Sequence, residues 1–183
     1  MSKILIVYHS GYGHTRKVAE AVLAGAQEAG ADTKLIAVGD LDDALWAELD
    51  TADAIIFGAP TYMGGPSADF KKFADASSKP WFAQKWKDKI AAGFTNSAHM
   101  NGDKFLTISY FVTLAMQHGM IWVGLGELAE GTGADKVNRL SAYGGAMAQT
   151  DWGQDQVNDG DRKTAAILGK RVAEAAARWA KEK

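Results

Sequence analysis

A predicted strand runs directly into a polar, glycine-containing loop at residues 4–15, which read ILIVYHSGYGHT. The run Ile4–Tyr8 is continuously apolar rather than alternating, which is typical of a strand buried on both faces of a sheet. Apolar residues then recur at helical spacing over about residues 15–29, and Gly30 follows them, which predicts a helix that ends there. This strand–loop–helix unit is the usual building block of parallel sheets that helices cover.

The same unit recurs along the chain. Short apolar runs predict further strands at residues 34–38, 54–58, 89–94 and 120–123, and helical patterns lie between them at residues 41–49, 67–76 and 103–118. Asp161 is predicted to cap a last helix. Five alternations of strand and helix predict an α/β fold with a parallel sheet. Right-handed crossovers leave two common strand orders, the Rossmann order and the flavodoxin-like order 2-1-3-4-5, and both place a ligand at the carboxyl ends of the strands.

Length and composition narrow the classes of function. A chain of 183 residues suits a single domain, 1–183, and its net charge of -2 gives no reason to expect a nucleic-acid or membrane partner. No apolar run is long enough to span a bilayer and no signal peptide is recognisable, so a cytoplasmic location is expected. The chain contains no cysteine, and no metal site is expected. Redox chemistry here would therefore need a bound cofactor.

One long stretch, residues 124–160, contains no convincing long helix or strand. Structureless segments of that length are uncommon in compact domains and usually carry function. A functional role is therefore expected for it, although its sequence does not say which. Trp152 lies in this stretch, and Trp81 lies in another irregular one, so for both a pocket or interface role competes with ordinary packing.

The loop after the first strand has the composition of a phosphate site. It offers Ser10, Gly11, Gly13 and Thr15 directly before a helix, where unpaired amides and the helix dipole favour an anion. It is not the dinucleotide fingerprint, because Arg16 stands where that motif needs a third glycine. It is not a Walker A loop either. An ordinary strand-to-helix turn with a polar cap is the competing interpretation.

Two further loops should reach the same edge of the sheet. Residues 60–66 read PTYMGGP, so that their backbone could approach the edge of a flat ring while Tyr62 or Met63 lies against it. Residues 95–102 read TNSAHMNG and could hydrogen-bond a polar heterocycle. A proline-bounded turn and a solvated loop are the competing interpretations. Together, the three loops favour a ligand site more strongly than each does separately.

Three of these motifs carry a family resemblance. Residues 8–15 (YHSGYGHT), 57–64 (FGAPTYMG) and 115–120 (AMQHGM) resemble the WrbA-type NAD(P)H:quinone oxidoreductases, within the wider flavodoxin and FMN-reductase superfamily. The likeness covers most of the chain and fades at residues 37–50 and 124–160. It implies a flavodoxin-like three-layer sandwich with a five-stranded parallel sheet, FMN as cofactor, NAD(P)H as co-substrate, a quinone-like small molecule as substrate, and a homodimer or homotetramer.

The resemblance also implies site residues, position by position. The FMN phosphate would contact Ser10, Tyr12, Gly13, His14 and Thr15. The flavin ring would lie against Pro60, Thr61, Tyr62, Met63 and Gly64. The loop along the other side of the ring would supply Thr95, Asn96, Ser97 and Gly102, in a segment that is richer in glycine in that family. His118 matches a histidine at the substrate side of the ring and is the expected catalytic residue, and Trp81 matches a tryptophan that approaches a neighbouring subunit's site.

Function then has one leading interpretation and three alternatives. A bound flavin would take hydride from NAD(P)H and pass it to a quinone, provided that one ring face is open. An electron-carrier flavodoxin would instead cover the ring with aromatic side chains from the second and third loops, and would be strongly acidic. Residues 95–102 contain no tyrosine or tryptophan and the chain is nearly neutral, which favours the enzyme. A flavin reductase that releases reduced FMN, and a non-catalytic FMN-binding regulator, also remain open.

Overall fold

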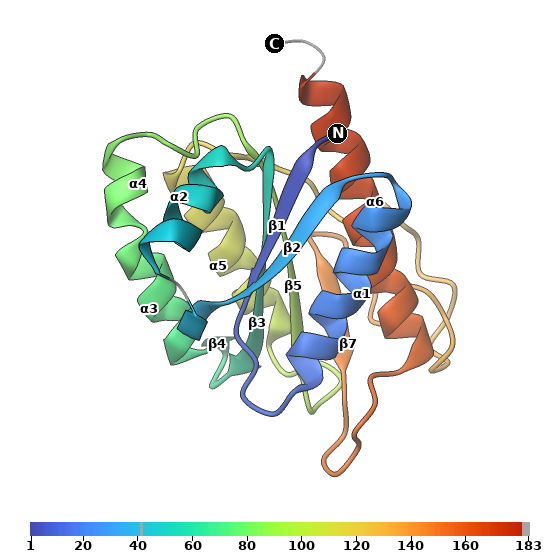
Figure 1. The fold of residues 1–183 in the computed structure, drawn as a ribbon. Coiled ribbons are helices and arrows are strands. Elements are labelled where there is room, and N and C mark those ends of the chain that lie inside the picture. Colours follow the sequence, from blue (N-terminus) through green and yellow to red (C-terminus); the bar gives the residue numbers. More distant parts are fainter. Residues whose placement is uncertain (41, 181–183) are drawn as a thin grey trace.

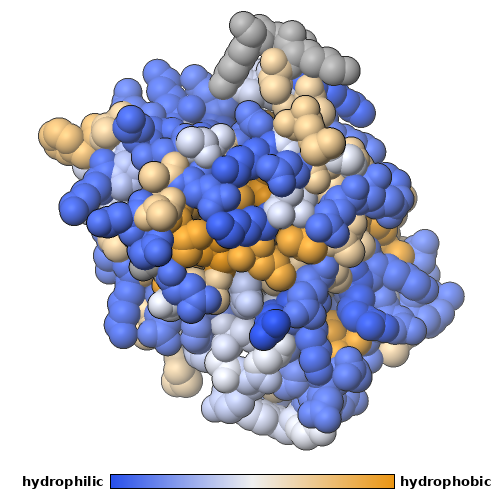
Figure 2. All heavy atoms as spheres, in the orientation of Figure 1, coloured by the Kyte–Doolittle hydropathy of each residue, from blue (hydrophilic) through white to orange (hydrophobic). Residues whose placement is uncertain are grey.

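A parallel sheet lies between two layers of helices in the computed structural model, which describes residues 1–40 and 42–180 (Figure 1). Leu41, at the predicted start of a helix, and residues 181–183, at the end of the predicted domain, lie outside the described residues. Among the described residues, each helix is too short or too polar to cross a bilayer. The face shown in Figure 2 is mostly hydrophilic, with an apolar area near its centre.

The elements follow the predicted alternation. The strands are β1 (Lys3–Tyr8), β2 (Asp32–Ala37), β3 (Ala54–Tyr62), β4 (Gly65–Pro66), β5 (Ile90–Ser97), β6 (Ile121–Trp122) and β7 (Ala146–Gln149). The helices are α1 (His14–Glu28), α2 (Asp43–Thr51), α3 (Ala68–Ala76), α4 (Ser78–Phe82), α5 (Lys104–Gln117) and α6 (Asp159–Ala180), with a 3-10 turn η1 (Val38–Asp40). The order β2-β1-β3-β5-β6 confirms the predicted flavodoxin-like order 2-1-3-4-5.

The fifth position of the sheet is shared by two short strands. β6 pairs with the beginning of β5, where Ile90 lies opposite Ile121, and β7 pairs with the end of β5, where Ser97 lies opposite Gln149. The sequence analysis did not find β7, because its four residues include no β-branched or aromatic side chain. Residues 150–155 therefore follow a parallel strand, at the same edge of the sheet as the three predicted loops.

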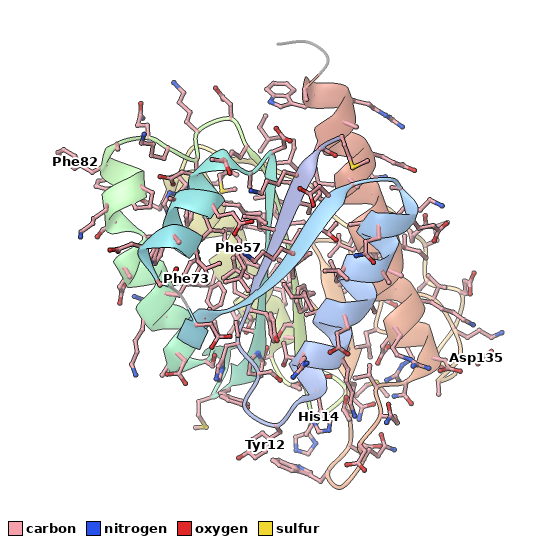
Figure 3. All side chains as sticks on the ribbon, in the orientation of Figure 1. Tyr12, His14, Phe57, Phe73, Phe82 and Asp135 are labelled. Carbon is pink, nitrogen blue, oxygen red and sulfur yellow. The ribbon has the colours of Figure 1, made fainter. Side chains whose placement is uncertain are left out.

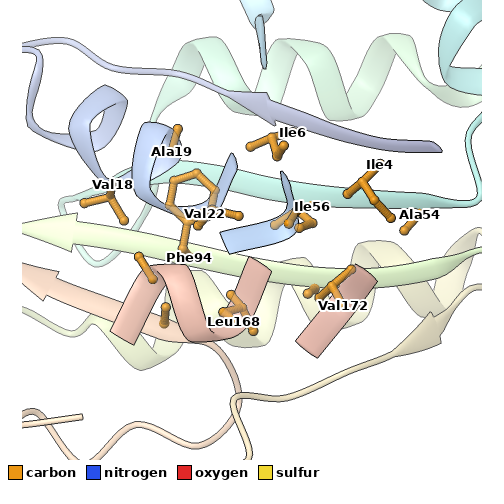
Figure 4. Close-up of a cluster of buried hydrophobic side chains, with 14 of the residues drawn as sticks. Ile4, Ile6, Val18, Ala19, Val22, Ala54, Ile56, Phe94, Leu168 and Val172 are labelled. Atoms are coloured by element: carbon orange, nitrogen blue, oxygen red, sulfur yellow. The ribbon is translucent and has the colours of Figure 1, made fainter. Parts of the chain in front are cut away.

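Both faces of the sheet are buried, as the continuous apolar run in β1 predicts. Ile4 and Ile6 pack with α1 and α6 on one face (Figure 4), whereas Leu5 and Val7 belong to the cluster on the other face, with α3 and α5. α1 and α6 lie in close contact, since a Cβ at Gly169 would lie 1.9 Å from the carbonyl oxygen of Val22. This contact holds the amino-terminal end of α1 in a defined place beside the sheet.

The second loop is a tight hairpin rather than an open segment. β3 extends through Tyr62 and turns back into β4, with Tyr62 opposite Gly65. The two residues between them, Met63 and Gly64, both have positive φ, 48° and 79°, as a two-residue turn of type I′ requires. Met63 is fully exposed, so the hairpin presents its side chain at the carboxyl edge of the sheet.

Candidate functional site

Four loops at the carboxyl edge of the sheet surround a cavity of about 770 Å³. This is where ligands bind in open α/β sheets, and the volume lies in the usual range for small-molecule sites. The predicted residues that line the cavity are Tyr12, His14, Thr15, Pro60, Thr61, Tyr62, Met63, Gly64, Asn96, Ser97 and Gly102. Figure 3 shows Tyr12 and His14 at this end of the molecule, whereas Phe82 lies toward the other end.

Three of the predicted cofactor residues do not line the cavity directly. Ser10 accepts a hydrogen bond from the backbone N–H of Arg16 on its Oγ, at 3.2 Å, which shapes the turn into α1. Gly13 precedes α1 with a φ of 87°. Thr95 is fully buried, and its hydroxyl lies 2.8 Å from that of Thr61, beneath the cavity wall. Their positions support neighbours that do line the cavity.

The amino-terminal end of α1 is suited to an anion. The first amides of a helix have no partner within the helix; here the Arg16 N–H donates to Ser10 Oγ, whereas the N–H groups of His14 and Thr15 have no partner among the described residues. The first turn contains no acidic residue, so nothing opposes the positive end of the helix dipole. His14 also lies here, with its Nε2 2.6 Å from the carbonyl oxygen of Gln154. These features support the predicted phosphate site.

The third loop also presents unpaired amides. None of the backbone N–H groups of residues 98–102 donates a hydrogen bond to another described residue. The buried ammonium of Lys104 instead gathers the opposite groups of this loop, namely Ser97 Oγ and the carbonyl oxygens of His99 and Met100. The loop is therefore held from inside, and of its residues with unpaired amides Ala98, His99 and Gly102 line this cavity.

The sequence analysis missed the fourth wall of the cavity. It is formed by residues 150–155 after β7, together with Ala98 and His99 of the third loop. Trp152 is 77% exposed, and the sequence signals for this wall were the length of the irregular stretch 124–160, for which a functional role was expected, and the position of Trp152 within it. The side chain of Lys17 donates to the carbonyl oxygen of Asp155, so this loop is tied to the first turn of α1.

Tyr12 and Tyr62 meet at the mouth of the cavity. Their ring centroids are 6.4 Å apart, with the planes nearly perpendicular. A Cβ at Gly11 would lie 2.5 Å from the Tyr62 hydroxyl oxygen, so glycine is needed for this approach of the first two loops. Burial raises the pKa of Tyr62 above its usual value, and its hydroxyl stays protonated at neutral pH.

The structure does not bring His118 to this cavity. α5 runs antiparallel to the strands, so its last residues lie at the amino ends of the sheet, beside the start of β6. His118 is 5% exposed there, stacked on Trp86 at 4.3 Å between ring centroids. Its Nε2 donates to Ser77 Oγ at 2.9 Å, because the Ser77 hydroxyl gives its own proton to the carbonyl oxygen of Ala74. The expected proximity to the ligand in the same chain is therefore not found.

His118 should instead make stability depend on pH. Burial lowers the pKa of its imidazole to about 4, and its Nδ1 has no partner among the described residues. The unfolded chain takes up a proton near pH 6.5 and the folded chain only near pH 4, so stability should fall as pH drops through this window, by about 3 kcal/mol. Urea unfolding from pH 7 to 4 measures this, with His118→Gln as the comparison. Equal pH slopes in parent and variant would contradict it.

The chain matches, over residues 2–135, the family described as NADPH-dependent FMN reductase. It belongs to this family. Membership implies an FMN cofactor. A flavodoxin named FldP from Pseudomonas aeruginosa is 46% identical over 94% of this chain and 96% of its own length. An NAD(P)H dehydrogenase (quinone) from Sinorhizobium fredii is 32% identical over 98% of this chain and 100% of its own.

A solved structure of a WrbA-like protein is similar to this chain in both sequence and fold. The crystal structure of a flavodoxin, WrbA-like protein from Agrobacterium tumefaciens is 50% identical, with a TM-score of 0.81 over 97% of this chain and 99% of that one. The resemblance to WrbA-type proteins that residues 8–15, 57–64 and 115–120 indicate is thus confirmed. An archaeal flavodoxin at 20% identity, with a TM-score of 0.67, shares the fold.

The residues around the cavity fit the cofactor that the family implies. FMN has a phosphate at one end and a ring with polar edges at the other. The unpaired amides of His14 and Thr15 at the start of α1 suit the phosphate, and the unpaired amides of Ala98, His99 and Gly102 suit the acceptors of a polar ring edge. The hairpin at Met63 and Gly64 lies between them along the cavity wall. Both donor groups thus lack partners that FMN has the chemistry to supply.

Proposed function

We propose that this protein binds FMN in the cavity and transfers hydride from NAD(P)H through it to a quinone or a similar flat acceptor. The observation that carries the proposal is one continuous cavity that joins the start of α1, where the amides of His14 and Thr15 are unpaired, to the unpaired amides of Ala98, His99 and Gly102. Membership of the NADPH-dependent FMN reductase family supports the donor. The relative named NAD(P)H dehydrogenase (quinone) supports the acceptor.

The chain's part in this function is to bind, orient and stabilise. FMN, when bound, supplies an N5 atom that accepts and returns hydride. The start of α1 binds the phosphate, and the hairpin at Met63 and Gly64 holds one side of the ring. The amides of Ala98, His99 and Gly102 would donate to a polar edge of the ring and would favour negative charge there, as preorganised donors do at other anionic sites.

Anaerobic titration tests this function. In the protein purified with FMN, one equivalent of NADPH or NADH should rapidly remove the visible absorbance of the flavin. Benzoquinone should then restore this absorbance. The contradicting result is FMN that stays oxidised in the presence of both nicotinamides. Activity that appears only with excess free FMN would point to a flavin reductase that releases its product.

One observation favours a second function, that of an electron carrier. Tyr62 and the exposed Trp152 both line the cavity, so the chain has two aromatic side chains from different loops that could cover the two faces of the ring. The relative at 46% identity is named a flavodoxin. The absence of tyrosine and tryptophan from residues 95–102 favoured the enzyme, but Trp152 comes from the loop after β7 and could cover the ring instead.

Trp152→Ala separates the two functions. An enzyme whose ring is already open should change little, whereas a carrier whose ring Trp152 covers should gain reactivity with NADPH. Tyr143→Ala is the control, because this half-exposed aromatic side chain belongs to a different cavity. Little reaction with NADPH in the parent protein, and a large increase in Trp152→Ala, would establish the carrier.

We also propose that the protein assembles as a homodimer or homotetramer through α4. Trp81 is 45% exposed and Phe82 85% exposed, with their rings in edge contact. Trp81→Ala should weaken assembly at least tenfold, because tryptophan is a common interface hot spot, and should lower quinone turnover while FMN affinity stays unchanged. Light scattering with activity assays measures this. A monomer with full activity at low concentration would contradict a shared site.

A further inference from the structure

We propose that Lys104 is a positioning residue for the bound ligand. Its buried ammonium holds the wall formed by residues 97–102 in place, with Ser97 and His99 at the cavity, and its charge favours a ligand that becomes negative there. This inference rests on the proposed function, since it concerns reduced FMN in the same cavity. It adds a residue that does not line the cavity itself.

Lys104 is buried to an extent that is unusual for a lysine. It is 1% exposed at the first turn of α5, and lysine is almost never fully buried unless it is paired. All three of its N–H groups find acceptors in one loop: Ser97 Oγ at 2.8 Å, the His99 carbonyl oxygen at 2.7 Å and the Met100 carbonyl oxygen at 2.9 Å. A buried ammonium must be hydrogen-bonded, and because all three acceptors lie within residues 97–100, the lysine fixes this segment in particular.

These contacts decide which way the loop's amides point. In a trans peptide unit the C=O and the following N–H point in opposite directions. The carbonyl groups of His99 and Met100 point inward to the ammonium, so the N–H groups of Met100 and Asn101 point away from it. None of them donates to another described residue. Met100 and Asn101 border a different cavity from the proposed FMN site, so at the FMN cavity Lys104 positions Ser97 and His99, which line it and which the ammonium contacts directly.

Packing alone does not hold this loop. Ser97, Ala98 and His99 border the cavity of about 770 Å³, whereas Met100 and Asn101 border a second cavity, of about 550 Å³. The loop is therefore a thin wall with empty space along both sides. Two successive left-handed residues, Gly102 at φ 55° and Asp103 at φ 53°, let the chain turn into α5.

The buried charged groups next to residues 97–102, namely Arg139, Asp161 and Lys104, carry a net positive charge. Arg139 and Asp161 form a two-point ion pair, with Nε to Oδ1 at 2.8 Å and Nη2 to Oδ2 at 2.9 Å. Lys104 adds a further positive charge, so the three groups sum to one positive charge. Burial and Arg139 lower the pKa of Lys104 to about 8 while Asp161 raises it, which leaves the ammonium charged at neutral pH. A net buried cation stabilises negative charge in a neighbouring site.

The test compares the affinities of oxidised and reduced FMN. Lys104→Met keeps the length of the side chain and removes its charge and donors. It should weaken the preference for reduced FMN by at least about tenfold, which lowers the two-electron midpoint potential by about 30 mV. In the apoprotein, amide hydrogen exchange at residues 98–102 should become faster. Lys104→Arg should recover part of the potential, because it keeps the charge.

Lys170→Met is the control for net charge. This lysine pairs with Glu28 at 2.7 Å on the surface, and its loss should leave the potential unchanged. A Lys104→Met protein that binds FMN, with parental potential and parental loop exchange, would overturn the inference while the proposed function stands. A parent protein that binds neither FMN nor reduced FMN would overturn the proposed function, and this inference with it.

Discussion

FMN is expected to bind this protein far more tightly than riboflavin, because the start of α1 offers a site for the phosphate that riboflavin lacks. Replacing Ser10 and Thr15 together with alanine should weaken FMN binding at least about a hundredfold, or about 3 kcal/mol, because the Thr15 hydroxyl is lost as a donor to the charged phosphate and the Ser10 hydroxyl is lost as the support of the turn. Riboflavin binding should change by less than about threefold. Fluorescence titration of the apoprotein with each flavin measures both affinities.

The two replaced residues play different parts in this expectation. Ser10 fixes the turn by accepting from the Arg16 N–H, and Thr15 lines the cavity within the first turn of α1. Thr113→Ala is the matched control, because its hydroxyl donates to the Ser109 carbonyl oxygen on an exposed part of α5. Equal affinity of the parent protein for FMN and riboflavin would show that the phosphate is bound elsewhere or not at all.

Asp161→Ala is expected to destabilise the protein by about 3–5 kcal/mol, because it leaves the buried Arg139 guanidinium without its carboxylate. The side chains of this ion pair are 4% and 1% exposed. Asp161 also accepts from the backbone N–H of Gln149, at 2.9 Å, so β7 should loosen as well. Urea unfolding of the apoprotein measures the stability, and FMN affinity should fall with it, since residues 150–155 follow β7.

Two comparisons make this expectation specific. Arg162 and Asp159 form an exposed ion pair three residues apart on the same helix, and Arg162→Met should cost less than about 1 kcal/mol. The double variant Arg139→Met with Asp161→Leu should recover much of the loss, because it leaves no buried charge unpaired. A single Asp161→Ala variant as stable as the parent would show that the pair contributes little.

The sequence pattern around Asp161 correctly predicted a nearby helix start but did not indicate the ion pair that Asp161 forms with Arg139. An aspartate before a helical stripe predicts a cap, and a helix does begin nearby, at Asp159. The carboxylate of Asp161, however, pairs with Arg139, from a segment in which no pattern was recognisable. Pairing between distant residues leaves no periodic signal, so a sequence argument has no means of finding it.

The sheet and most of the cavity were predictable from the sequence because they depend on local patterns. Continuous apolar runs such as Ile4–Tyr8 follow from burial on both faces, and right-handed crossovers then restrict the strand order. Parallel strands bring their carboxyl ends to one edge, so the loops at residues 10–15, 60–66 and 95–102 had to meet. Most of the predicted ligand residues in them do line the cavity.

The tertiary structure alone decided the rest. β7 forms only because β5 offers a free edge beyond β6, and this places Trp152 at the cavity. His118 lies in the motif at residues 115–120 that resembles the family. Because α5 runs antiparallel to the strands, however, His118 lies at the opposite end of the sheet from the cavity. Lys104 reads as an ordinary residue at a helix start, and its burial against three acceptors appears only when the loop folds back over it. Each of these outcomes depends on which distant segments come into contact, and short-range patterns carry no information about that.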